Sequence, residues 1–92
     1  MFSDCSNFTT FDSDLSSLTE GRYMFYRTNL VSFTSDLSSL TDGEGMFYRT
    51  NLESFNSNLS SLTHGFGMFY QCKNLTTFDS DLSSLDYGYS MF

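Results

Sequence analysis

The sequence contains no proline, tryptophan, alanine or isoleucine, and its single valine is Val31. Its apolar side chains therefore come from leucine, phenylalanine, tyrosine and methionine. So narrow a composition often belongs to a disordered chain, in which too little apolar surface is available to offset chain entropy. Here aromatic residues make up 18% of the chain, and they recur in register along it. We therefore predict a folded repeat protein.

Cations are also scarce, with four Lys and Arg residues against eleven Asp and Glu residues and a formal net charge of -7. Affinity for nucleic acid comes from Lys and Arg side chains that neutralise phosphates, and anionic membrane surfaces attract basic segments. The composition therefore disfavours both partners. No apolar run approaches the roughly 18 residues of a membrane span, so we expect no membrane insertion. No signal peptide is recognisable either.

The motifs of common catalytic centres are missing as well. The sequence has no Walker-type loop, no pair of histidines at ligand spacing and no Cys-x-x-Cys. A serine nucleophile needs a base within reach, and His64 is the only histidine. We therefore predict no enzyme activity, no catalytic residues and no cofactor. The repeated Ser-Ser pairs, such as Ser38-Ser39, are expected to form hydrogen bonds along the repeat instead.

What the sequence does contain is one segment repeated four times. The units span residues 1–23, 24–45, 46–67 and 68–90, and a fifth opens at 91–92. A fixed period in the twenties is typical of a solenoid of stacked coils, so we predict a single repeat array, mainly β, with four coils of 22–23 residues. Six apolar positions recur in the four units, and stacking would bury them in one continuous core. Their columns begin at Met1, Phe2, Phe8, Phe11, Leu15 and Leu18.

Within a unit, the residue types suggest where each local element lies. A short strand is expected near Leu30 to Ser35, followed by an arc of turns, since Ser and Asp compete for backbone hydrogen bonds. A glycine recurs at one slot of the return, as at Gly43, and suggests a positive φ. The Met-Phe-Tyr segment after it is expected to form one helical or 3₁₀ turn. We also expect that turn to be the least regular part, because it must absorb a one-residue difference in unit length.

The two cysteines, Cys5 and Cys72, occupy the same slot of the first and fourth units. Three coils at a strand spacing of about 4.8 Å would place them roughly 14 Å apart. A disulfide requires a much shorter Cα separation. We therefore expect buried free thiols that pack as small apolar groups.

Residues 68–79 read Met-Phe-x-x-Cys-x-x-Leu-Thr-x-Phe-Asp, and residues 1–12 match them with Phe8 in the leucine slot. This pattern resembles the BspA-like class of leucine-rich repeats, found in bacterial and protist surface proteins. The resemblance covers essentially the whole chain, although the second and third units lack one residue and the cysteine. It implies a right-handed coil with a short parallel sheet, a cell-surface or secreted location, adhesion and partner binding, and no catalysis. The matched motif is structural, so no family site residues are carried over.

Two sets of aligned polar residues are candidates for a site. The first is the column of Asp14, Asp36, Asn58 and Asp81, whose oxygens could hold Ca²⁺ or could form turns before Leu-Ser-Ser. There is no Asp-x-Asp-x-Asp-Gly loop, so we favour the turn interpretation and predict no metal site.

The second set is the preferred partner-binding site, because Tyr and Arg are frequent among residues that dominate binding energy. Its tyrosines could instead cap the core with their hydroxyls in water. Tyr23, Tyr87 and Tyr89 add aromatic surface near the glycine turns. The predicted binding residues are Tyr26, Arg27, Tyr48, Arg49, Tyr70 and Gln71.

We therefore predict a non-catalytic cell-surface module that binds a protein or glycan partner. The alternative is a structural building block whose coils stack end to end, since Met1-Phe2 and Met91-Phe92 would leave apolar positions open. In that case the chain would associate with copies of itself through its terminal coils.

Overall fold

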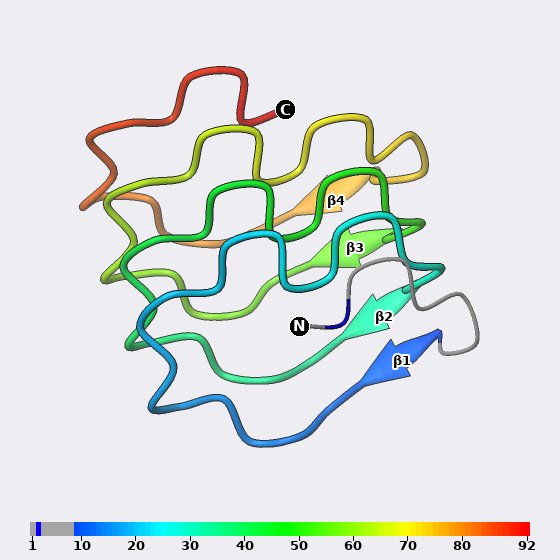
Figure 1. Ribbon diagram of the computed structural model, residues 1–92, viewed down its shortest axis with the longest axis horizontal. Helices are drawn as coiled ribbons and strands as arrows, with labels where there is room; N and C mark the ends of the chain where they lie inside the picture. Colours follow the sequence, from blue (N-terminus) through cyan, green and yellow to red (C-terminus); the bar gives the residue numbers. More distant parts are fainter. Residues whose placement is uncertain (1, 3–8) are drawn as a thin grey trace.

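The computed structural model describes residue 2 and residues 9–92, and among them it contains four two-residue strands (Figure 1). The strands are β1 (Thr10–Phe11), β2 (Ser32–Phe33), β3 (Ser54–Phe55) and β4 (Thr77–Phe78). β1 pairs in parallel with β2, and β3 pairs in parallel with β4. In both pairs a phenylalanine lies opposite a phenylalanine. The repeated column beginning at Phe11 is thus brought into register by the backbone.

The parallel arrangement was predicted, but the strands are shorter than the expected span of Leu30 to Ser35, and two separate two-stranded sheets replace one. The reason lies just after each phenylalanine. The Asp36 carboxylate accepts a hydrogen bond from the Ser38 backbone N–H at 3.0 Å. Such a local bond draws the backbone into a turn and ends the strand early.

A second line of contacts joins the units on the far side of each coil. Parallel bridges connect Glu20 to Asp42, Asp42 to His64, and His64 to Tyr87. The bridged residues are 22 or 23 positions apart, which equals the predicted unit length. Figure 1 shows the resulting coils lying one above another, with β1 to β4 in succession along one side. This arrangement is consistent with the predicted solenoid, whose handedness and unit boundaries stay predictions.

The Met-Phe-Tyr segment is a run of successive turns rather than a helix. Each turn is closed by a hydrogen bond between residues three positions apart. Met24 donates its backbone N–H to Gly21 at 3.1 Å, Tyr26 to Tyr23 at 3.2 Å, and Thr28 to Phe25 at 3.2 Å. The run cannot continue as a helix because its flanks, Tyr23 and Arg27, have φ of 53° and 59°. The expected helical or 3₁₀ turn is therefore wrong in detail.

This segment is also regular from coil to coil, contrary to our expectation. Phe25 donates its N–H to Met46, Phe47 to Met68, and Phe69 to Met91, at 2.8–2.9 Å. The extra residue of the fourth unit lies just after this segment, between Cys72 and Leu75. There Leu75 donates its N–H to the Cys72 carbonyl at 3.2 Å and closes an added turn. The equivalent part of the first unit lies outside the described residues.

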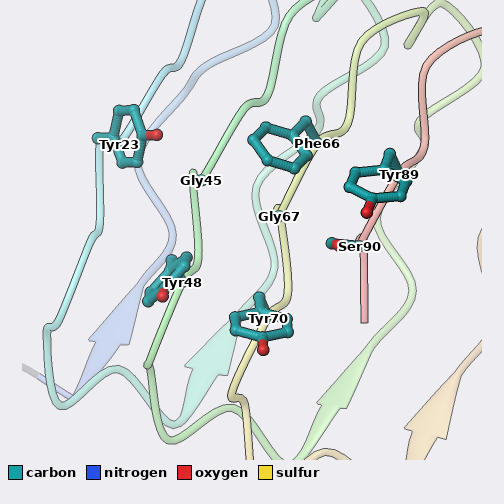
Figure 2. A pocket seen from close by; sticks show the side chains of 8 residues that line it. All are labelled: Tyr23, Gly45, Tyr48, Phe66, Gly67, Tyr70, Tyr89 and Ser90. Atoms are coloured by element: carbon teal, nitrogen blue, oxygen red, sulfur yellow. The ribbon is translucent and has the colours of Figure 1, made fainter.

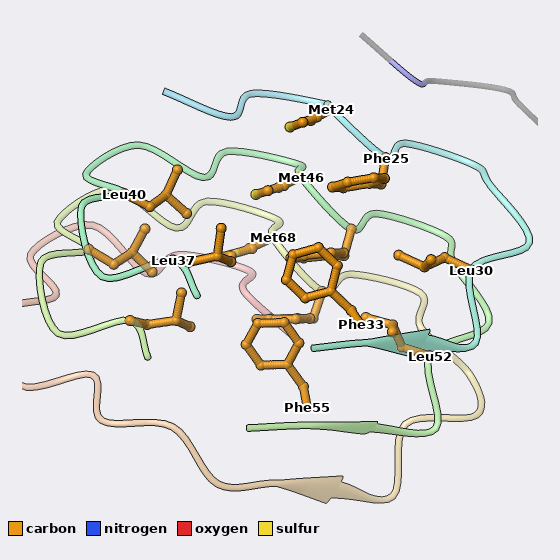
Figure 3. Close-up of a cluster of buried hydrophobic side chains, with 14 of the residues drawn as sticks. Met24, Phe25, Leu30, Phe33, Leu37, Leu40, Met46, Leu52, Phe55 and Met68 are labelled. Carbon is orange, nitrogen blue, oxygen red and sulfur yellow. The ribbon is translucent and has the colours of Figure 1, made fainter. Parts of the chain in front are cut away.

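The core consists of the predicted apolar columns, and their members in the two middle units are almost completely buried (Figure 3). Phenylalanine rings form two parallel ladders. Phe25, Phe47 and Phe69 stack face to face with centroids 5.5 and 5.4 Å apart, and Phe33 stacks on Phe55 at 5.9 Å. The ladders meet edge to face, a favoured geometry for aromatic pairs. Column members at Phe8 and Met1 lie outside the described residues.

The recurring glycine has a different role from the one predicted. Gly43 and its equivalents do not have positive φ; the glycines that do are Gly45 and Gly67, at 59° and 62°. A Cβ atom on Gly43 would come within 3.0 Å of the Met68 sulfur and 3.3 Å of the Leu40 side chain. Glycine is favoured at position 43 because a Cβ atom there would crowd a methionine of the adjacent coil.

Cys72 is a half-buried free thiol, as expected. It donates a hydrogen bond to the Phe47 carbonyl at 2.9 Å and lies 3.3 Å from the Thr50 hydroxyl. Burial raises the pKa of this thiol, so it packs as a neutral group. Cys5 lies outside the described residues. Across the part of the chain that is described, no helix has the length and apolarity of a membrane span.

Candidate functional site

The predicted tyrosine column forms a continuous aromatic ladder on the surface. Tyr26 and Tyr48 have ring centroids 5.3 Å apart, and Tyr48 and Tyr70 have centroids 5.4 Å apart. The rings are tilted by 56° and 50° instead of lying parallel. The Arg27 guanidinium lies 6.0 Å from the Tyr26 ring, at the outer limit of a cation–π contact.

Tyr48 and Tyr70 line an open groove of about 190 Å³, which we call the aromatic groove. Figure 2 shows its rings arranged around the backbone at Gly45 and Gly67. Sequence analysis noted Tyr23 and Tyr89 as additional aromatic surface but did not identify Phe66. The full lining consists of Tyr23, Gly45, Tyr48, Phe66, Gly67, Tyr70, Tyr89 and Ser90.

The groove exists because one slot of the repeat carries no side chain in two consecutive coils. That slot holds Tyr23, Gly45, Gly67 and Ser90, and each of them has positive φ. A left-handed conformation is easily adopted by glycine. The two glycines leave space between the Tyr48–Tyr70 ladder and the stacked rings of Phe66 and Tyr89, which lie 5.8 Å apart. In the sequence, the Gly-x-Gly pattern at 43–45 and 65–67 indicates the slot without a side chain.

Arg49 and Gln71 do not lie in the aromatic groove. They line a second open space of about 170 Å³, which we call the polar hollow, together with Thr50, Asn51 and Lys73. The structure therefore divides the predicted site into two parts. Tyr26 and Arg27 line neither part. The division follows from positive φ at Arg49 and Gln71, which turns the chain sharply after each tyrosine.

Among the described residues, an ion pair joins the first unit to the second. The Arg22 guanidinium lies 2.7 Å from the Asp42 carboxylate, and this hydrogen bond raises the pKa of Arg22. The Tyr23 hydroxyl donates to Glu44 at 3.0 Å, which raises the pKa of Tyr23. In the next coils the same slots hold aromatic rings, and His64 stacks on Tyr87 at 4.6 Å. At these two slots the residues thus change from charged to aromatic along the stack.

The Asp column forms turns, as the favoured interpretation predicted. Asp14, Asn58 and Asp81 each accept a hydrogen bond at 2.9 Å from the backbone N–H two residues ahead. The bond from Ser16 lowers the pKa of Asp14. The expected Ser-Ser ladder is wrong, because the serine hydroxyls that bond between coils belong to a different column. Ser80 donates to the Ser57 carbonyl at 2.7 Å.

Replacing Asp36 by alanine is expected to lower the free energy of unfolding by about 1 kcal/mol. The carboxylate accepts from the Ser38 N–H and from the Ser38 hydroxyl, both at 3.0 Å. Asp36→Asn is the matched control, since Asn58 already makes the N–H bond at the equivalent slot. Urea denaturation should show a change within about 0.5 kcal/mol for Asp36→Asn. Equal losses in the two variants would show that charge, not the turn bond, is responsible.

Comparison with known proteins identified a family to which the chain is similar. The family model described as "BspA type leucine rich repeat region (6 copies)" matches residues 1–92, the whole chain. No curated protein and no solved structure matches it.

Proposed function

The chain belongs to the BspA-type leucine-rich repeat family, and on this premise we propose that it is a non-catalytic binding module at the cell surface. The family is generally associated with surfaces and adhesion, and leucine-rich repeats generally mediate interactions. Its repeats are typically non-catalytic. The proposed partner is a protein or a glycan that docks in the aromatic groove.

The observation that carries this proposal is the groove itself. It places five aromatic rings, from the first, third and fourth units, around a floor of two glycines. Phe66, Tyr70 and Tyr89 are exposed, whereas Phe25, Phe47, Phe55 and Phe69 are buried in the core. Binding sites are commonly concave and apolar, with a few polar groups at the margin, and here the tyrosine hydroxyls and Ser90 supply those groups.

The repeat architecture explains why such a site would be effective. Each ring is attached to a turn that is fixed by hydrogen bonds within its coil and to the next coil. Tyr70 donates its N–H to Gly67 at 3.2 Å, and its carbonyl accepts from Arg49 at 3.0 Å. Rings held in this way lose little conformational freedom when a partner binds, and such preorganisation favours affinity.

The test is saturable binding to a panel of immobilised glycans and extracellular proteins. Combining Tyr70→Ala with Tyr89→Ala is expected to weaken binding at least about tenfold, since central aromatic anchors dominate interface energy. The matched control is Tyr87→Ala. Tyr87 is 61% exposed and lies outside the groove, whereas Tyr89 is 79% exposed and lies within it. Circular dichroism should show unchanged folding in both proteins, because the replaced rings are exposed.

Equal loss of binding in the Tyr87 variant would show that general surface aromaticity is responsible. Unchanged binding in the double variant would exclude the aromatic groove as the site of contact.

A further inference from the structure

The polar hollow combines two cations with uncharged hydrogen-bonding groups. Its lining residues are Arg49, Thr50, Asn51, Gln71 and Lys73, whose side chains carry a guanidinium, a hydroxyl, two amides and an ammonium. Arginine and lysine offer only donors, while each amide offers donors and an acceptor. The Thr50 hydroxyl lies against Cys72 instead. The lining residues thus carry donors on two cations and on two amides, of which the Asn51 amide also donates to the Asn29 side chain at 3.4 Å.

The two cations in the hollow have no carboxylate partner among the described residues. The chain has only four Lys and Arg residues against eleven Asp and Glu residues. Arg22 pairs with Asp42 at 2.7 Å, whereas neither Arg49 nor Lys73 forms an ion pair within residue 2 and residues 9–92. In a protein with a net charge of -7, two cations without a carboxylate partner in one hollow indicate an anionic group from outside.

An irregularity of the repeat places the second cation there. In the second and third coils, the residue after Thr28 or Thr50 leads directly into the leucine column. In the fourth coil an added residue forms the turn from Cys72 to Leu75, and Lys73 lies in that turn. The insertion thus supplies a charge next to Arg49 that the shorter coils do not have.

The polar hollow also adjoins the aromatic groove. Tyr48 and Arg49 are consecutive, as are Tyr70 and Gln71, and the first member of each pair lines the groove while the second lines the hollow. A ligand that spans both would place an apolar ring face in the aromatic groove and an acid group in the polar hollow. Sugar rings that carry acid groups have both features, and their hydroxyls would match the amides of Asn51 and Gln71.

We propose that the polar hollow binds the carboxylate or sulfate group of an acidic glycan whose adjoining sugar ring packs in the aromatic groove. This inference rests on the proposed function and specifies its ligand class. Arg49 supplies a planar guanidinium suited to paired oxygens, and Lys73 supplies a point charge. An acidic peptide such as poly-glutamate would use the cations and the amides but has no ring to pack in the aromatic groove.

The experiment measures binding by isothermal titration at one fixed salt concentration. Four probes are used: an oligogalacturonate, a sulfated dextran oligosaccharide, a neutral dextran oligosaccharide of the same length, and poly-glutamate. We expect saturable binding of at least one acidic sugar and binding of the neutral sugar at least about tenfold weaker, since hydrogen bonds to charged groups are the stronger ones. The two acidic sugars distinguish a carboxylate from a sulfate ligand.

Charge variants then locate the contact. Arg49→Gln and Lys73→Gln should each weaken binding of the acidic sugar about tenfold and leave the neutral sugar unchanged. Glutamine fits at position 49 because Gln71 occupies the equivalent slot with φ of 60°, against 59° for Arg49. Arg27→Gln is the matched control, since it removes the same charge from the same column outside the hollow.

The outcomes separate this inference from the function on which it rests. Equal binding of neutral and acidic sugars that is lost in the Tyr70/Tyr89 variant would overturn the acid site and leave the proposed function standing. Poly-glutamate that binds as tightly as the sugars, or equal losses in Arg27→Gln and Arg49→Gln, would also overturn the acid site. Binding of no sugar, with a protein partner still held by the tyrosines, would overturn it as well. Binding that depends on neither the tyrosines nor the cations would contradict both proposals.

Discussion

Replacing Phe47 by alanine is expected to lower the free energy of unfolding by about 3–5 kcal/mol. The ring is 0% exposed, belongs to one aromatic ladder and contacts the other. It stacks on Phe25 and Phe69 at 5.5 and 5.4 Å, and it meets Phe33 and Phe55 edge to face at 4.9 and 5.2 Å. Truncation would remove these contacts together and leave a cavity whose rigid walls cannot close.

The repeat makes this position more sensitive than an ordinary core site. Each coil buries its apolar positions only against its neighbours, and Phe47 lies in a middle coil with a stacked ring on either side. Its loss would therefore weaken the contacts of the coils on both sides. Since domains of this kind have a total stability of about 5–15 kcal/mol, the variant should unfold at a much lower urea concentration.

Two further variants make the Phe47 result interpretable if the alanine protein does not fold. Phe47→Leu keeps much of the volume and should lower stability by about 1–2 kcal/mol. Phe66→Ala makes the same chemical change at a ring that is 43% exposed and stacks only on Tyr89, and about 1 kcal/mol is expected there. A loss at position 66 as large as the loss at position 47 would contradict the ladder as the main source of stability.

The core could be predicted from the sequence because it is periodic. A column such as Phe33, Phe55 and Phe78 has the same residue in successive units, and its members all pack in the core, fully buried in the middle coils and partly buried in the last. The turn role of Asp36 could be predicted for a similar reason, since a short acidic side chain bonds locally whatever surrounds it. Both inferences need only the repeat and the chemistry of one residue.

The remaining features depend on three-dimensional detail that single residue types do not report. Arginine and tyrosine rarely adopt positive φ, yet Tyr23, Arg27 and Arg49 do so here, because coil-to-coil hydrogen bonds fix their backbone. The space near Gly43 depends on a methionine of the next coil. Residue type alone therefore assigned positive φ to the wrong glycine.

The candidate site shows the same limit. The sequence predicted that tyrosines and arginines would act together, because both residue types are frequent among residues that dominate binding energy. The left-handed turn at Arg49 instead directs the column after Tyr48 into a separate hollow. Phe66 could not be recognised because its slot holds Arg22 and Glu44 in earlier coils, so no column pointed to it.

Replacing Gly45 by alanine is expected to lower the free energy of unfolding by about 2–4 kcal/mol. Two causes act at this position. Its φ of 59° is unfavourable for any residue with a Cβ atom, and that atom would overlap the Tyr23 ring. To make room, the ring would have to leave its hydrogen bond with Glu44, which is 3.0 Å long.

Gly67→Ala separates these two causes, because the chain offers the same backbone conformation without the crowding. Gly67 has φ of 62°, and the nearest atom to a new Cβ would be a Tyr48 ring carbon at 3.7 Å. Only the backbone strain of about 1 kcal/mol should remain. Adding Tyr23→Ala to Gly45→Ala should bring the two positions to similar values in urea denaturation. If the double variant recovered none of the difference, crowding by Tyr23 would not be its cause. Because Gly45, Gly67 and Tyr23 all line the aromatic groove, the same proteins would also show whether partner binding depends on the shape of its floor.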